Sequence, residues 1–161
     1  MKFNFFLLFI AFVIFYGCSN NANNPEFIKK VSGRYLYNSD EVIQVYFEDN
    51  EMFMEWRGAK KIKPLKVDET TFFVKEMNEK IQFLTNPANQ KQYIILVPKE
   101  ENAPIVYNFM KLNKDEKVPS EYLASKEFDK ALEGYLAIKK RDSSDSSIDE
   151  KYLNSLPKFS K

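Results

Sequence analysis

The sequence predicts a mainly β protein, in which an antiparallel meander of eight strands curls into a small barrel and a C-terminal α-helical appendage follows. Two observations support this prediction. From Val31 to Leu112 apolar and polar residues alternate, which is the period of half-buried strands. After Pro119 the apolar residues recur at every third and fourth position instead, which is the period of an amphipathic helix.

The clearest strand signal is a hairpin over residues 43–56. Two alternating runs, 43–47 and 52–56, flank Asp49 and Asn50, which favour a tight two-residue turn. Six further runs bounded by turn-forming residues complete the eight strands: 34–37, 62–67, 70–75, 80–85, 92–97 and 105–111. Pro64 lies inside its run and predicts a sheet edge or a bulge, because proline has no N–H to donate. A flat, open meander would expose its edges, so a curled sheet or barrel is expected.

The C-terminal segment, residues 114–161, is predicted to be helical. Ser120 is the expected N-cap of a helix whose last turn carries three basic residues, a favourable charge at a helix C-terminus. Its apolar stripe consists of Leu123, Phe128, Ala131, Leu132, Tyr135 and Ile138. A polar break over residues 142–147 precedes a shorter helix over residues 148–156. We expect the stripe to pack on the sheet or to cap one end of the barrel, and a peptide-binding helical surface is the alternative.

The first 17 residues have the pattern of a signal peptide. Lys2 supplies a positive charge, residues 3–15 are almost wholly apolar, and Gly17 is the small residue before the expected cleavage point. The apolar run is shorter than the roughly 20 residues that a membrane-spanning helix needs. The polar, asparagine-rich residues 18–26 are the expected flexible tether, and residues 27–113 are the expected β domain.

Cys18 directly follows Gly17, and this N-terminus resembles the lipobox of bacterial lipoproteins. The resemblance implies cleavage before Cys18 and acylation of that cysteine, with palmitate among the expected chains, so that its lipid holds the mature protein at the membrane. Ser19 resembles a release signal towards the outer membrane. The expected location is the bacterial cell envelope, at the outer membrane and facing the periplasm. An uncleaved anchor, or an ordinary cysteine after an ordinary signal, is the alternative.

Two further resemblances concern the rest of the chain. Residues 27–112 contain an opening Ser32-Gly33-Arg34-Tyr35, the Asp49-Asn50 turn and aromatic strands. They resemble the lipocalin-like β domain that follows the catalytic domain in bacterial serine hydrolases of the β-lactamase and penicillin-binding type. In that family this module is an accessory, and its catalytic domain has no counterpart in this sequence. Residues 120–156 resemble a partial tetratricopeptide-like helical unit.

The composition argues against most enzyme classes and against nucleic-acid binding. The chain has no histidine, and its single cysteine, Cys18, is the expected acylation site, so the commonest general base and the commonest metal ligands are missing. Loss of residues 1–17 removes Lys2 from the 24 basic residues and leaves 23 against 23 acidic ones. A chain without net charge has no overall field that attracts nucleic acid. We therefore expect no enzyme activity and no cofactor.

Two local patterns are interpreted as coincidence. Ser155 begins a Ser-x-x-Lys pattern of the serine acyl-transfer type, but the accompanying motifs are in the wrong order and Lys-Thr-Gly is missing. Asp142, Asp145 and Asp149 have neither the spacing nor the glycine of a calcium-binding loop. A solvated acidic loop is expected there, and no metal site.

Three functions remain open. The one we expect is a non-catalytic interaction module, which uses a sheet edge or the helical stripe to bind another envelope protein. A carrier of a small apolar ligand is the second, with Met52, Met54 and Trp56 lining the barrel, although the same residues would otherwise be plain core. The third is a hydrolase that uses only carboxylates, for which the sequence favours no particular pair. The lysines in residues 60–63 would contact anionic headgroups or form a solvated turn.

Overall fold

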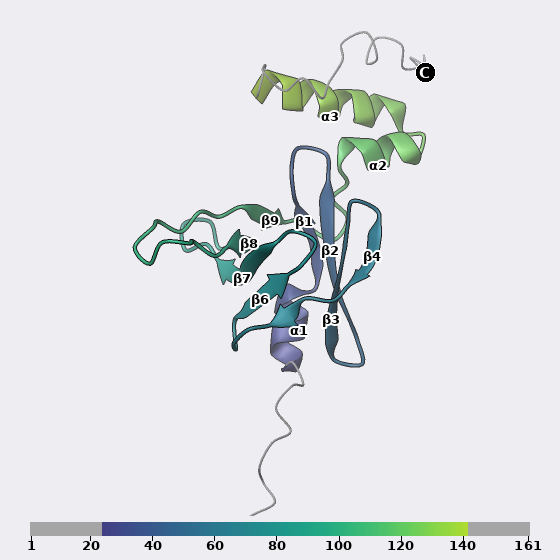
Figure 1. The fold of residues 1–161 in the computed structure, drawn as a ribbon. Helices are drawn as coiled ribbons and strands as arrows, with labels where there is room; N and C mark the ends of the chain where they lie inside the picture. Colours follow the sequence, from purple (N-terminus) through teal and green to yellow (C-terminus); the bar gives the residue numbers. More distant parts are fainter. Residues whose placement is uncertain (1–23, 142–161) are drawn as a thin grey trace, which may run out of the picture.

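A computed structural model describes residues 24–141, which form nine strands and three helices (Figure 1). In chain order the elements are α1 (Pro25–Val31), β1 (Gly33–Leu36), β2 (Val42–Glu48), β3 (Glu51–Trp56), β4 (Ala59–Ile62), β5 (Leu65–Lys66), β6 (Thr71–Val74), β7 (Glu79–Thr85), β8 (Gln92–Leu96), β9 (Phe109–Lys111), α2 (Pro119–Ala124) and α3 (Phe128–Arg141). The mainly β fold with a helical C-terminal segment is confirmed. Gly17 and Cys18 lie outside the described residues, as do Ser155 and the predicted helix over residues 148–156.

The strands form a single antiparallel sheet in the order β4-β3-β2-β1-β9-β8-β7-β6-β5. The first and last strands, β1 and β9, are neighbours in its middle. Its two edges are β4 and β5, which follow each other in the chain and do not pair, so the sheet curls into a half-barrel instead of a closed barrel. We name the two parts on either side of the β1–β9 junction the β1–β4 wing and the β5–β9 wing.

The sheet has nine strands and not eight because Pro64 divides one predicted strand. The run over residues 62–67 contains the end of β4 and all of β5, with Lys63 and Pro64 between them. The edge position predicted for Pro64 is confirmed, since both flanking strands are sheet edges.

The predicted hairpin at Asp49 and Asn50 is confirmed. The register of β2 with β3 leaves only these two residues between the strands, and their φ angles are 49° and 64°. Positive φ at both central positions defines a type I′ turn, which favours Asn and Asp. Arg57 and Gly58, with φ angles of 50° and 79°, form the corresponding turn between β3 and β4. These tight turns hold the β1–β4 wing together.

Helix α1 fills the concave side of the half-barrel and lies between its two wings (Figure 1). The ring of Phe27 contacts rings from both wings, with centroid distances of 6.4 Å to Phe47, 6.0 Å to Phe72 and 6.1 Å to Phe83. Val31, at the end of the helix, is completely buried. The buried apolar core beneath α1 consists of Tyr35, Ile43, Val45, Met52, Met54, Ile62, Phe72, Val74, Ile81, Phe83, Ile94 and Phe109.

The sequence pattern did not predict α1, and the helix shortens the expected tether. Asn24 caps it, because its side-chain oxygen accepts a hydrogen bond of 2.8 Å from the backbone N–H of Glu26. Pro25 occupies the first turn, where its missing N–H costs nothing. Residues 25 and 26, assigned above to the flexible tether, therefore belong to the folded domain.

The predicted helix after Pro119 is divided in two, and its N-cap is not Ser120. Val118 is the N-cap, with Pro119 in the first turn, and the Glu121 carboxylate accepts a 3.0 Å hydrogen bond from the Val118 N–H. Lys126, with φ of 60°, lies in the break between α2 and α3. The Ser120 N–H is capped from the sheet instead, as described next.

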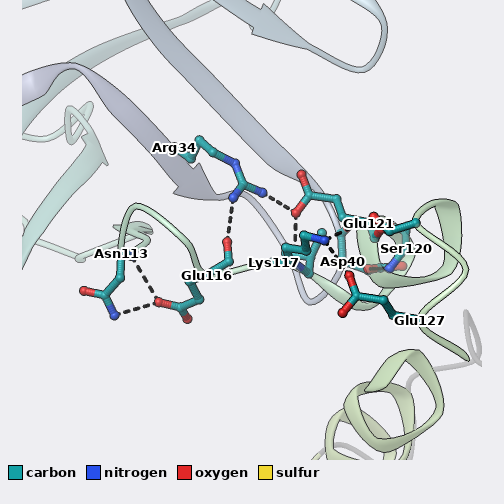
Figure 2. Close-up of polar contacts among 10 residues, drawn as sticks. Arg34, Asp40, Asn113, Glu116, Lys117, Ser120, Glu121 and Glu127 are labelled. Atoms are coloured by element: carbon teal, nitrogen blue, oxygen red, sulfur yellow. Dashed lines mark hydrogen bonds and ion pairs between the residues drawn. The ribbon is translucent and has the colours of Figure 1, made fainter. Parts of the chain in front are cut away.

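Helices α2 and α3 lie beyond the β1–β2 end of the sheet, at the opposite end from the start of α1 (Figure 1). Asp40, in the β1–β2 loop, accepts hydrogen bonds from the Ser120 N–H at 2.7 Å and from the Tyr135 hydroxyl at 2.8 Å. On β1, Arg34 donates to the Glu116 carbonyl and forms an ion pair with Glu121 (Figure 2). Polar contacts therefore attach the helical pair to the sheet.

Part of the apolar stripe packs between α2 and α3, and the helical pair lies at one end of the half-barrel, which is the second of the two positions expected for it. Ile138, which is buried, contacts Leu123, Leu132 and Tyr135. Gly134 permits the close approach of the helices, because a Cβ atom there would lie 2.7 Å from Cγ of Pro119.

Candidate functional site

The two methionines of the predicted ligand-lining stripe are core residues. Met52 and Met54 are 4% and 1% exposed and belong to the apolar cluster beneath α1. Phe27 of α1 occupies the middle of the concave side, where a ligand of a carrier would have to lie. The structure therefore places both methionines in the packed core.

Trp56 lies at the end of β3 and packs, partly buried, against the same apolar cluster. Its ring packs against Tyr37 at 5.1 Å, and the Arg57 guanidinium lies 5.1 Å from the centroids of both rings. The indole N–H is buried and has no hydrogen-bond partner among the described residues. Trp56 also borders a groove of ≈ 290 Å³ that includes Arg34 and Glu121, on the side of the sheet that faces α2.

The β4 edge is unsuited to pairing with another strand. Its first three residues are exposed, and Lys60, Lys61 and Lys63 project from this end of the wing. Lys61 has a φ of 56° and lies where the register with β3 shifts, so the edge contains a bulge. Lysines and bulges are among the features that protect sheet edges from further pairing, as are very short strands and prolines.

The β4 lysines are also engaged by carboxylates. Lys61 lies 3.0 Å from Glu48, and Lys63 lies 2.7 Å from Glu51. The Glu48 carboxylate raises the pKa of Lys61 through a hydrogen bond and its negative charge. Two of the three lysines predicted to contact anionic headgroups, Lys61 and Lys63, are thus paired with acidic residues of β2 and β3.

The β5 edge presents apolar side chains and an open backbone. Leu65 and Val67 are 58% and 50% exposed, and they lie next to each other but one along this edge. Leu65 is opposite Phe73 of β6, so these side chains share the outer, convex face of the sheet. The patch formed by Leu65, Val67 and the half-buried Phe73 is named the β5 patch.

The backbone of Lys66 points away from the sheet. The Val67 N–H donates a 2.9 Å hydrogen bond to the Thr71 carbonyl, so Val67 and Thr71 are a hydrogen-bonded pair. Such pairs alternate along an antiparallel ladder, and Lys66, opposite Phe72, is therefore in a non-hydrogen-bonded pair. Its N–H and C=O are directed outward, where an added strand would meet them.

Within the described residues, no group of three or more Asp, Glu, His or Cys side chains is placed to hold a metal ion. None of the helices in residues 24–141 is long and apolar enough to cross a membrane. Compared with known proteins, the chain matches no family model, no curated protein and no solved structure. The lipoprotein, lipocalin-like and tetratricopeptide-like resemblances therefore stay predictions.

Sequence reasoning identified the position of the β5 edge but not its residues. Pro64 indicated an edge nearby, whereas Leu65 and Val67 were counted as ordinary members of an alternating strand. The signal that could have found them is Pro64 itself. Proline cannot donate a ladder hydrogen bond, so residues beside it are candidates for an edge strand.

Proposed function

We propose that this protein is a non-catalytic, lipid-anchored envelope protein that acts as an interaction module. Its β5 edge would accept an extended segment of another envelope protein as an added strand. The observation that supports this proposal is the contrast between the β5 edge, with exposed Leu65 and Val67, and the β4 edge, which carries lysines and a bulge. Strand addition uses main-chain hydrogen bonds for affinity and alternate side chains for specificity.

The anchor in this proposal is the lipid on Cys18, after cleavage at Gly17. The tether from Cys18 to Asn24 spans at most about 20 Å when extended. Because α1 begins directly after Asn24, the folded domain would stay close to the membrane surface, within reach of other proteins anchored there. The membrane is thus one partner and the segment that pairs with β5 is the other; nucleic acid is not expected to be one.

The packing of the concave side favours an interaction module over a carrier. Phe27 stacks on Phe72 and makes edge contacts with Phe47 and Phe83, so aromatic rings occupy the interior. A ligand there would have to displace α1. No described residue supports the carboxylate-only hydrolase more specifically than the sequence did.

Site-specific photo-crosslinking in the native envelope tests the proposal. A benzophenone amino acid replaces Val67 in one variant and Lys60, on the β4 edge, in the control. We expect a discrete adduct with an envelope protein from position 67 and none from position 60. The substitution Lys66→Pro removes the outward N–H without breaking a bond to β6, and should abolish the adduct, whereas Lys66→Ala should retain it.

Equal adducts from both edges would contradict a role for the β5 edge. So would an adduct from position 67 that is unaffected by Lys66→Pro, because strand addition requires that N–H. Acylation is tested separately: the mass of the mature chain should include fatty acids, and Cys18→Ser should remove them.

A further inference from the structure

A groove where β1 meets β9 contains positive charge without a carboxylate among its lining residues. It has a volume of ≈ 360 Å³. Its polar and charged lining side chains are those of Ser32, Arg34, Gln44, Lys111, Asn113 and Lys114. Three of the six are cationic, in a chain whose basic and acidic residues are nearly equal in number, 24 and 23.

Lys111, a partly buried residue, is held by the backbone of α1. Its ammonium donates a 2.7 Å hydrogen bond to the Lys30 carbonyl near the end of α1, which uses one of its three hydrogens. Burial lowers the pKa of Lys111. Among residues 24–141, none of the ion pairs includes this lysine. The negative end of the helix dipole compensates only part of its charge.

Gly33 fixes the position of the Lys111 side chain. A Cβ atom at residue 33 would lie 2.7 Å from Cε of Lys111, and the φ of Gly33 is 140°, a backbone conformation that favours glycine. The lysine stem therefore lies directly against the backbone of β1. The ammonium is held at the groove before any ligand arrives, which reduces the ordering cost of binding.

Arg34, on β1, is held by two partners. Its two terminal nitrogens contact the Glu116 carbonyl and the Glu121 carboxylate, which leaves other guanidinium N–H groups for a ligand (Figure 2). The Glu116 carboxylate is occupied by the backbone N–H and side-chain amide of Asn113, at 3.1 Å and 2.9 Å. The carboxylates of Glu116 and Glu121 both lie beside the groove and offset part of the charge of the lining cations.

We propose that this groove binds a phosphate group, supplied either by a soluble phosphate compound or by the headgroup of an anionic phospholipid. Three cations line the groove and the carboxylates of Glu116 and Glu121 lie beside it, so an excess of about one positive charge remains for an anionic phosphate group. Lys111 and Lys114 act as point charges, and Arg34 offers the planar donors that fit phosphate oxygens. This site is separate from the β5 edge and does not depend on the function proposed for it.

Nuclear magnetic resonance of the ¹⁵N-labelled full chain in lipid nanodiscs tests the proposal. In phosphatidylcholine nanodiscs, inorganic phosphate is titrated at constant ionic strength against chloride. In phosphatidylglycerol nanodiscs no free phosphate is added. We expect saturable amide shifts at Gly33 and Lys114 from inorganic phosphate if the source is soluble, or shifts in the second sample alone if it is the headgroup.

Matched lysine variants measure the contribution of each cation. Lys111→Met keeps the aliphatic stem and should weaken binding at least tenfold, because it removes a positioned, charge-assisted hydrogen bond. Lys114→Met, at an exposed position, should weaken it severalfold without affecting folding. Lys91→Met, at an exposed site between β7 and β8, is the control and should leave binding unchanged. Absence of shifts in both kinds of nanodisc, or equal affinity in Lys114→Met and Lys91→Met, would overturn the proposal.

Discussion

The β4 and β5 edges are separated by two residues of chain but differ in what they present to solvent. The β4 edge has exposed lysines, a bulge at Lys61, and one buried side chain, Ile62, that faces the core. The β5 edge has two exposed aliphatic side chains, Leu65 and Val67, and an outward backbone at Lys66. Sheet edges without a role are usually blunted. Among the described residues, the β4 edge is charged and bulged, whereas the β5 edge is short and flanked by exposed aliphatic side chains.

The largest expected difference between the edges is in the free energy of unfolding lost when Ile62 of β4 or Leu65 of β5 is replaced by alanine. Ile62→Ala should reduce the free energy of unfolding by about 2–5 kcal/mol, because Ile62 is 4% exposed and its loss leaves a cavity. Leu65→Ala should change it by less than about 0.5 kcal/mol, because Leu65 is 58% exposed. Urea unfolding followed by circular dichroism measures both. A loss above 1 kcal/mol for Leu65→Ala would show that another part of the chain covers the β5 patch.

A smaller difference in stability is expected between a valine substitution at Lys61 of β4 and one at Lys66 of β5. Lys61→Val should destabilise the protein by about 1–2 kcal/mol, since a β-branched residue is strained at a φ of 56°. Lys66→Val should be nearly neutral, because Lys66 is in regular extended structure. Thermal unfolding of the two variants at the same pH provides the comparison. Equal destabilisation would mean that the bulge at Lys61 is not what distinguishes β4.

The smallest effect is opposite pH dependence of the two edges. Hydrogen bonds from Thr70 and Thr71 lower the pKa of Asp68, next to β5, so its contribution is present above the ordinary pKa of an aspartate and is lost as the pH falls through the lowered value. Glu48 raises the pKa of Lys61 on β4, so that contribution is present below the ordinary pKa of a lysine and is lost as the pH rises through the raised value.

Amide hydrogen exchange separates these two titrations. Exchange at the Val67 N–H should accelerate in acid beyond the intrinsic pH dependence, and Asp68→Asn should remove that acceleration. Exchange of the β4 amides should accelerate in alkali beyond the intrinsic pH dependence, as Lys61 loses its proton. Lys61→Gln should remove that acceleration. Simultaneous loss of protection at both edges would indicate global unfolding and not the local effect of either residue.

Much of the sheet was predictable from local pattern. The period of two located the strands, the Asp49-Asn50 pair defined a turn whose φ angles agree with its type, and Pro64 marked a sheet edge. The predicted number of strands was wrong by one. A proline between two short edge strands has the same sequence pattern as a proline within one strand.

The helices were harder to predict because their signals are short or shared. Helix α1 has seven residues, too few to establish a period, and Asn24 and Pro25 were interpreted as part of a polar spacer although they are a cap and a first-turn proline. The break at Lys126 has no glycine or proline to announce it. The start of α1 is therefore set by local residues that a polar spacer would also contain, and the break at Lys126 by a backbone conformation that the pattern does not mark.

The candidate sites depend on neighbours that the sequence does not reveal. Leu65 and Val67 became distinctive only when the sheet order placed β5 at an edge. Arg34 and Lys111 border one groove because β1 pairs with β9, strands at opposite ends of the β domain. Periodicity assigns a residue to a face of a strand, but it does not say which distant strand lies alongside.

The pairing of β1 with β9 also sets the order in which the half-barrel assembles. Every other strand pair joins strands that are consecutive in the chain, with the longest connection over residues 97–108, whereas this one brings Tyr35 opposite Lys111. The entropy of closing a loop grows with its length, so the hairpins of each wing form first and the β1–β9 pair closes last. Since Phe27 contacts both wings, α1 cannot complete its packing before that closure. Among the described residues α1 is the first helix in the chain, yet we expect it to be among the last parts of the domain to become stable, only after β9 has paired with β1.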